Sequence, residues 1–243
     1  MGTSQSFKLK SNPNWTSAKK ALTRIVTHKG DMENNYRHLM VNMRDAIGDS
    51  LYIGGGVHGK HSFGYAGGAA LKGFVGLVSS ARNGGIWPAL NIEPGTQETH
   101  IRTMREILDA ILMYLSTDTK YPHDDAAAIN AMNIVLIEIM RGCEDEMDVN
   151  ERLQNATEDN VRKWIIDYEI EYILEYSAMV FQSHIFDKCD QPDAIRQQIA
   201  NWLRGEIERD MTEQIRSIDL ATEEGRNELE KLTAQILDIW QQE

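Results

Sequence analysis

Apolar side chains recur at intervals of three and four residues along most of this 243-residue chain. This spacing places them on one face of an α-helix, whereas a half-buried strand needs strict alternation. The stretch 124–140 is apolar on almost every side, which is typical of a helix at the centre of a core. We therefore expect an all-α fold, a bundle of about seven to eight helices, over the ranges 14–30, 31–48, 66–82, 96–115, 124–140, 157–186, 192–220 and 222–240.

The expected helix 66–82 contains many small residues, among them Gly67, Gly68, Gly73 and Gly76. A glycine inside a helix costs about 1 kcal/mol relative to alanine, so close packing has to compensate. We expect another backbone to lie against this helix, so that leucine at position 73 or 76 would overpack the contact.

Charge is distributed unevenly along the sequence. Residues 1–92 carry 11 Lys/Arg and 4 Asp/Glu, a net charge of +7, whereas residues 93–243 carry 14 and 33, a net charge of −19. The basic part could meet nucleic acid, another anion or an acidic protein surface, including the acidic helices of its own chain. We expect Lys19, Lys20 and Arg24 to lie partly against those acidic helices.

These patterns together give an expected domain organisation. Residues 1–13 would form a flexible N-terminal tail, and 14–92 a basic helical region. That region would include a glycine-rich loop at 48–65, and an acidic helical region, 93–243, would complete one continuous fold.

The glycine-rich loop contains two patterns that resemble nucleotide-binding motifs. Gly54-x-Gly56-x-x-Gly59 matches the dinucleotide fingerprint, and Gly54-x4-Gly59-Lys60 resembles a phosphate loop, although His61 stands where serine or threonine would bind Mg²⁺. Both motifs need a buried strand before them and a helix directly after them, and neither is expected here. We keep only His58, Lys60 and His61 as candidate anion or partner contacts.

We find no catalytic constellation, no metal-ligand spacing and no cofactor motif, so we expect a protein that is not an enzyme. Asp124 and Asp125 are interpreted as the start of their own helix, because acidic residues are favourable there. The acidic run at 144–148 is interpreted as a solvated turn. No apolar stretch is long enough for a membrane span and no secretory signal is recognised, so we expect a cytoplasmic protein without membrane contact.

The N-terminal residues are expected to form an exposed segment that an enzyme or a partner could bind. The first thirty residues contain six Lys/Arg and no acidic residue, and they begin Met1-Gly2-Thr3-Ser4. Removal of Met1 would leave an unhindered glycine amine among small polar neighbours, and Gly2-x-x-x-Ser6 also fits the permissive myristoylation pattern. Gly2, Thr3 and Ser4 are therefore candidate modification or partner-binding residues, against the alternative of a frayed terminus.

Several short motifs occur in an order that resembles the QatB component of Qat anti-phage defence systems. They cover about the first 140 residues and consist of Met1-Gly2-Thr3-Ser4, Ala18-x-x-x-Leu22-Thr23-Arg24, Gly54-Gly55-Gly56, Ala66-Gly67-Gly68-Ala69, Leu71-x-Gly73-Phe74 and Arg82-x-Gly84. The chain departs from that family at Phe7-Lys8-Leu9-Lys10, where a Gly/Pro-rich tail is common.

The resemblance implies a non-catalytic partner of a QueC-like protein, together with an ATPase and a TatD-like nuclease of the same operon. QueC-like enzymes activate a carboxylate with ATP, and the Gly2 amine could capture such a group. The resemblance therefore implies that Gly2 is presented to the QueC-like protein and joined there to a deazaguanine-type group. A nucleic-acid-binding module that uses the basic half, or a helical scaffold for the ATPase, remains the alternative; nucleic acid is not the expected partner.

Overall fold

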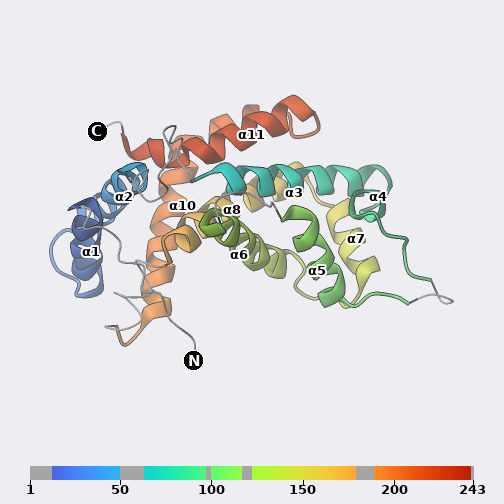
Figure 1. The fold of residues 1–243 in the computed structure, drawn as a ribbon, viewed down its shortest axis with the longest axis horizontal. Helices are drawn as coiled ribbons and strands as arrows, with labels where there is room; N and C mark the ends of the chain where they lie inside the picture. Colours follow the sequence, from blue (N-terminus) through green and yellow to red (C-terminus); the bar gives the residue numbers. More distant parts are fainter. Residues whose placement is uncertain (1–12, 50–62, 97–99, 117–121, 179–188, 242–243) are drawn as a thin grey trace. The chain divides into compact units, whose positions relative to one another are not determined.

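The computed structural model describes residues 13–49, 63–96, 100–116, 122–178 and 189–241. These residues form ten α-helices and one 3₁₀ helix, and they contain no strand (Figure 1). The all-α prediction is confirmed, although the helices outnumber the expected seven to eight. The excess comes from two short helices that the apolar pattern did not reveal, α4 (Trp87–Leu90) and α7 (Glu146–Gln154).

The chain divides into two compact units. Among the described residues, one unit contains 13–49, 189–199 and 237–241, and the other contains 63–96, 100–116, 122–178 and 200–236.

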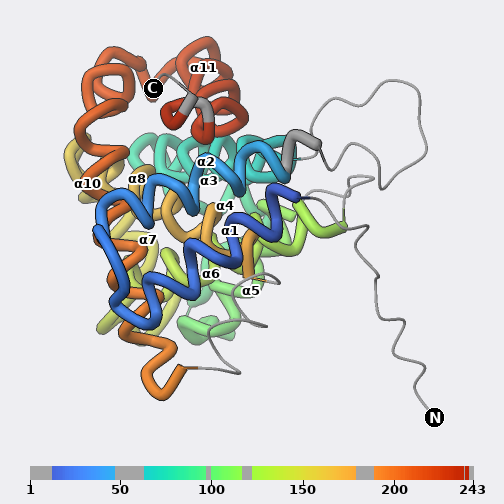
Figure 2. Tube along the Cα trace, turned by 90° about the vertical axis from the view of Figure 1, so that its left-hand side faces the viewer, coloured from blue at the N-terminus to red at the C-terminus, as the bar shows by residue number. Residues whose placement is uncertain are grey.

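In the first unit, α1 (Pro13–Val26) and α2 (Met32–Asp49) form an antiparallel hairpin (Figure 2). Its turn uses Gly30 in the left-handed region with φ +78°, and the Asp31 carboxylate accepts from the Glu33 backbone N–H at 3.0 Å. The buried apolar side chains of the two helices are Ala18, Ala21, Leu22, Ile25, Tyr36, Leu39, Met40, Met43 and Ala46.

The second unit is built around α3 (Tyr65–Gly84). The helix α11 (Glu223–Gln235) runs alongside α3, as Figure 1 shows, and α6 (Pro122–Ile139) packs on both α3 and α8 (Glu158–Tyr176). The helix α6 is less buried than expected, because Ile137 is 45% exposed.

The remaining elements have bounds that differ from the expected ones at several ends. The helix α5 (Met104–Leu115) begins later than the expected start at 96, because Thr103 caps it and the Glu106 side chain completes a capping box. The helix α10 (Pro192–Ser217) begins at its proline, as expected. The end of the chain changes from α11 to a 3₁₀ helix at Ile236–Gln241.

Close backbone packing against α3 occurs at other glycines than those expected. A Cβ at Gly68 would lie 2.6 Å from the Glu230 backbone oxygen, and a Cβ at Gly64 would collide with the Ala234 backbone, so both glycines let α11 approach. At Gly73 the neighbour is the Leu115 side chain at 2.8 Å, and at Gly76 the nearest atoms belong to Arg226 at 4.0 Å. The expectation of backbone contact at positions 73 and 76 was therefore wrong.

None of the helices in the described part of the chain is both long enough and apolar enough to cross a membrane.

Candidate functional site

The residues expected to bind partners fall into two groups. Gly2, Thr3, Ser4, His58, Lys60 and His61 lie outside the described residues. Lys19, Lys20 and Arg24 lie on α1, where Lys19 is half-buried and the other two are exposed. Lys20 and Arg24 are separated by four residues, so they share one face of the helix.

A buried polar cluster holds the start of α3, the first element described after the glycine-rich segment. The Asp124 carboxylate, with no exposed surface, accepts from the Ala66 backbone N–H at 2.7 Å and from the Tyr172 hydroxyl. The same hydroxyl accepts from the Gly64 backbone N–H at 2.7 Å. Asp124 lies in the first turn of α6, as expected, and its carboxylate also satisfies an N–H at the start of α3, which was not expected.

Aromatic side chains enclose this cluster. Phe63 stacks on Tyr172 with ring centroids 4.9 Å apart and meets Tyr176 edge-on at 4.8 Å. Tyr168 lies parallel to Tyr172 at 5.9 Å and donates its hydroxyl to the Gly67 carbonyl at 2.9 Å. A Cβ at Gly67 would collide with the Tyr172 ring, so glycine is required there.

The electrostatics of the cluster follow from its burial. Burial raises the pKa of Asp124, while the hydrogen bonds from Tyr172 and Ala66 act in the opposite direction. Burial also raises the pKa of Tyr172 well above its usual value, so its hydroxyl remains a neutral donor. A carboxyl group thus occupies the N-terminus of α3, where a phosphate loop would place its phosphate. This helix start is therefore not a free phosphate site.

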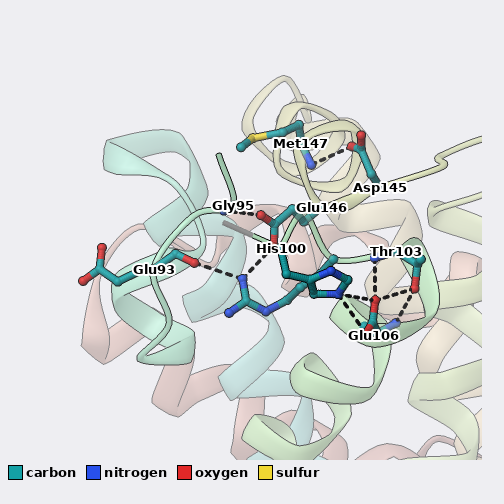
Figure 3. Close-up of polar contacts among 9 residues, drawn as sticks. Glu93, Gly95, His100, Thr103, Glu106, Asp145, Glu146 and Met147 are labelled. Carbon is teal, nitrogen blue, oxygen red and sulfur yellow. Dashed lines mark hydrogen bonds and ion pairs between the residues drawn. The ribbon is translucent and has the colours of Figure 1, made fainter. Parts of the chain in front are cut away.

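A second polar cluster joins the loop before α5 to the start of α7 (Figure 3). The buried Glu146 carboxylate accepts from the Arg102 guanidinium at 2.8 Å and from the Gly95 backbone N–H. Arg102 also donates to the Glu93 carbonyl at 2.9 Å. Asp145 caps α7 by accepting from the Met147 N–H at 2.9 Å.

The run 144–148 was expected to be a solvated turn, and the structure shows that it is not. Its backbone pairs with the residues before α5, because Met104 N donates to the Glu144 carbonyl at 2.9 Å and Glu146 N donates to the Arg102 carbonyl at 3.0 Å. The Arg102–Glu146 cluster fixes the geometry between α5 and α7, and its polar groups are directed at one another rather than at a ligand position.

A third buried carboxyl group lies between α8 and α11. Glu169 has no exposed surface, and one of its oxygens accepts from the Thr233 hydroxyl at 2.5 Å. Its other oxygen has no hydrogen-bond partner among the described residues. Burial raises the pKa of Glu169 to about 8, so the side chain is mostly protonated at neutral pH.

These clusters were missed because their partners are far apart in the sequence. Ala66 and Asp124, for example, are 58 positions apart in the sequence, so their contact leaves no local signal. In the described ranges, no group of three His, Cys, Asp or Glu side chains could hold a metal ion. The anion or partner contacts at His58, Lys60 and His61 and the role of the tail remain predictions.

Comparison of the chain with protein-family models, with curated proteins and with solved structures gives no match.

Proposed function

We propose that this protein is a non-catalytic component of a Qat-like anti-phage defence system. It would act as the partner of a QueC-like protein, in complex with an ATPase and in an operon that also encodes a TatD-like nuclease. Its N-terminal Gly2 would be presented to the QueC-like protein and modified there. The observation that carries the proposal is the sequence Met1-Gly2-Thr3-Ser4 in an acid-free segment ahead of α1, in the motif order of the QatB family.

The structure supports the proposal at two points. The first described helix begins at Pro13, and a proline at the first helical position is a favourable helix start. Apolar side chains of both α1 and α2 are also buried. Changes at Gly2 should therefore affect partner recognition without affecting the folding of these helices.

The chemistry requires a free amine at a defined position. The nitrogen of Gly2 would attack a carboxylate that the QueC-like protein has activated with ATP. A C–N amide bond forms, the bond to the activating group breaks, and the amine loses a proton. A substituent next to the nitrogen hinders both entry into a narrow pocket and this attack.

The test is a phage challenge of cells that carry the complete operon, with either the wild-type protein or the variant Gly2→Glu. A glutamate at this position retains Met1 and so removes the free glycine amine. We expect protection to be lost, while thermal melting of the purified variant stays unchanged. The matched control is Ser6→Glu, which adds the same charge and keeps the Gly2 amine, and we expect it to protect.

Intact mass distinguishes presentation of the tail from its modification. The wild-type protein should gain mass only when it is co-expressed with the QueC-like protein, and Gly2→Glu should not gain mass. Full protection by folded Gly2→Glu would refute the proposal. Loss of protection without added mass on the wild type would retain tail docking and refute the covalent step.

Exposed Lys20 and Arg24 on one face of α1 favour a second candidate, a nucleic-acid-binding module. Each phosphate contact releases counterions, so binding should weaken steeply with salt. A salt titration of duplex binding tests this candidate. A duplex affinity that is lost in Lys20→Gln/Arg24→Gln would favour it over the defence-partner proposal, and no measurable binding at physiological salt would exclude it.

A further inference from the structure

A cavity of about 550 Å³ lies in the second unit, where the end of α6 meets α7 and the start of α8. Its volume is in the range of roughly 300–1,000 Å³ typical of small-ligand pockets. All three helices belong to the same compact unit, so its walls are part of one body.

Acidic side chains outnumber basic ones in the lining. Glu138 from α6 and Asp148 and Glu151 from α7 contribute three carboxylates, against the single guanidinium of Arg152. Glu138 is paired with Arg141 outside the cavity, and both side chains are more than half exposed, at 58% and 75%. Such exposed pairs contribute at most about 1 kcal/mol, so an incoming cation can exchange with Arg141 at little cost.

The guanidinium of Arg152 is already used by the protein. It donates to the Ile139 carbonyl at 2.9 Å and to the Arg141 carbonyl at 3.5 Å, which are among the last carbonyls of α6 and its following turn. A helix C-terminus carries partial negative charge, and Arg152 compensates part of it. The guanidinium is thus hydrogen-bonded to backbone carbonyls. Asp148 is also engaged, because its carboxylate accepts from the Glu144 backbone N–H at 2.8 Å. Glu138 and Glu151 are therefore the carboxylates considered for a ligand.

The cavity also has an aromatic wall. Trp164 lines it, is half-buried and packs against Phe74 with ring centroids 6.1 Å apart, which holds the indole in place. Indole faces attract guanidinium and alkylammonium groups by about 0.5–2 kcal/mol. Carboxylates and an indole together favour an organic cation.

The lining is less consistent with two other functions of the cavity, a metal site and a nucleophilic cysteine. The described residues contain no convergent set of metal ligands, so the carboxylates are too dispersed to hold an inorganic cation. Cys143 also lines the cavity, but burial raises its pKa; Arg152 opposes this effect, and Asp148 and Asp145 add to it. Its thiol remains protonated and is a poor nucleophile.

We propose that this cavity binds an organic cation, a guanidinium or alkylammonium group, carried either by a basic peptide or by a free polyamine. The cation would sit between Glu138 and Glu151 with its alkyl part against Trp164. Binding there does not require the Gly2 tail.

Calorimetric titration of the purified full-length chain tests the proposal at about 50 mM salt, where screening is weak. The probes are an acetylated hexa-arginine peptide and spermidine. The variant Glu138→Gln/Glu151→Gln removes two charges at exposed positions and keeps the side-chain shapes. The control Glu208→Gln/Glu213→Gln removes two charges from the exposed surface of α10, so the change in net charge is the same.

We expect at least one probe to bind, and the cavity variant to weaken its binding about three- to tenfold, with less than about a twofold change for the control. A cavity-dependent loss for the peptide alone identifies a peptide ligand, and a loss for spermidine alone identifies a polyamine. Equal weakening by the two double variants would show general attraction to an acidic protein and overturn the proposal. Absence of binding by both probes would also overturn it.

Discussion

Glu146 and Glu169 are both glutamates with no exposed surface in the same compact unit, yet their surroundings differ. Glu146 accepts from the Arg102 guanidinium and from a backbone N–H. Glu169 accepts from one hydroxyl and leaves its second oxygen without a described partner. A buried charge is tolerated where a cation and donors compensate it, and is otherwise neutralised by a proton. The number of donors, rather than burial itself, decides which outcome applies.

We expect the largest loss of stability when the cation is removed from the Arg102–Glu146 pair. Arg102→Met leaves the Glu146 charge buried and should lower the free energy of unfolding by about 3–5 kcal/mol at pH 7. Chemical denaturation measures the loss. Arg141→Met, which breaks an exposed pair with Glu138, should change stability by less than about 0.5 kcal/mol. A similar small loss for Arg102→Met would mean that Glu146 does not depend on its cation.

We expect an intermediate loss of stability where a buried carboxylate is held by a neutral hydrogen-bond donor. Asp124 is held by the Tyr172 hydroxyl rather than by a cation, and the same hydroxyl satisfies the Gly64 N–H. Tyr172→Phe leaves both groups short of a partner and should cost about 1–3 kcal/mol in a thermal or denaturant melt. The exposed Tyr114→Phe serves as the control. Equal stabilities of the two variants would show that water replaces the lost hydroxyl.

The protonated glutamate should give a pH dependence of stability. Its pKa is about 8 in the folded protein and about 4.3 in an unfolded chain, so the folded state binds the proton more tightly. The stabilisation is complete below the unfolded pKa and is lost as pH rises towards and through 8. Glu169→Gln, which cannot ionise, should be more stable than wild type at pH 9. Below pH ~4 the difference should vanish.

The control for this pH dependence is Glu228→Gln, an exposed position on α11. Its stability should follow that of the wild type throughout the titration. A wild-type stability that stays flat between pH ~5 and ~9 would show that Glu169 is charged in the folded state, contrary to the comparison with Glu146.

The smallest effect is expected at an exposed carboxylate. The backbone hydrogen bond from Thr103, its hydroxyl and His100 lower the pKa of Glu106 to about 2. This carboxylate therefore adds stability that is present above its unfolded pKa and is lost as pH falls from about 4 through 2. Glu106→Gln can keep the capping box and should flatten the melting temperature of the protein in this acidic range only. A variant that melts like the wild type down to pH ~2 would contradict the expectation.

The sequence predicts the helices well because each one depends on local information. Periodic apolar positions identified α1, α2, α6 and α8, and Pro192 correctly gave the start of α10. The start of α5 was also readable in principle, because Thr103 and Glu106 have the spacing of a capping box. The expected start at 96 followed the end of Pro94-Gly95 instead of that signal.

Burial of polar residues was not predictable in the same way. Asp124 and Glu146 belong to acidic pairs or runs that are usually solvated, and only contacts over 58 and 44 residues bring their donors to them. The packing of glycines was also hard to predict, since Gly68 and Gly76 both lie inside the same expected helix. Only the position of α11 distinguishes the one that a neighbouring backbone approaches.

The pair of backbone hydrogen bonds between the residues before α5 and before α7 has a consequence for local opening. Met104 N and Glu146 N each donate across the same short bridge, although the two residues are far apart in the chain. Neither helix can fray at its first turn without breaking a bond that also holds the other. The starts of α5 and α7 should therefore form one cooperative opening unit, with amide protons that exchange with solvent at a shared rate.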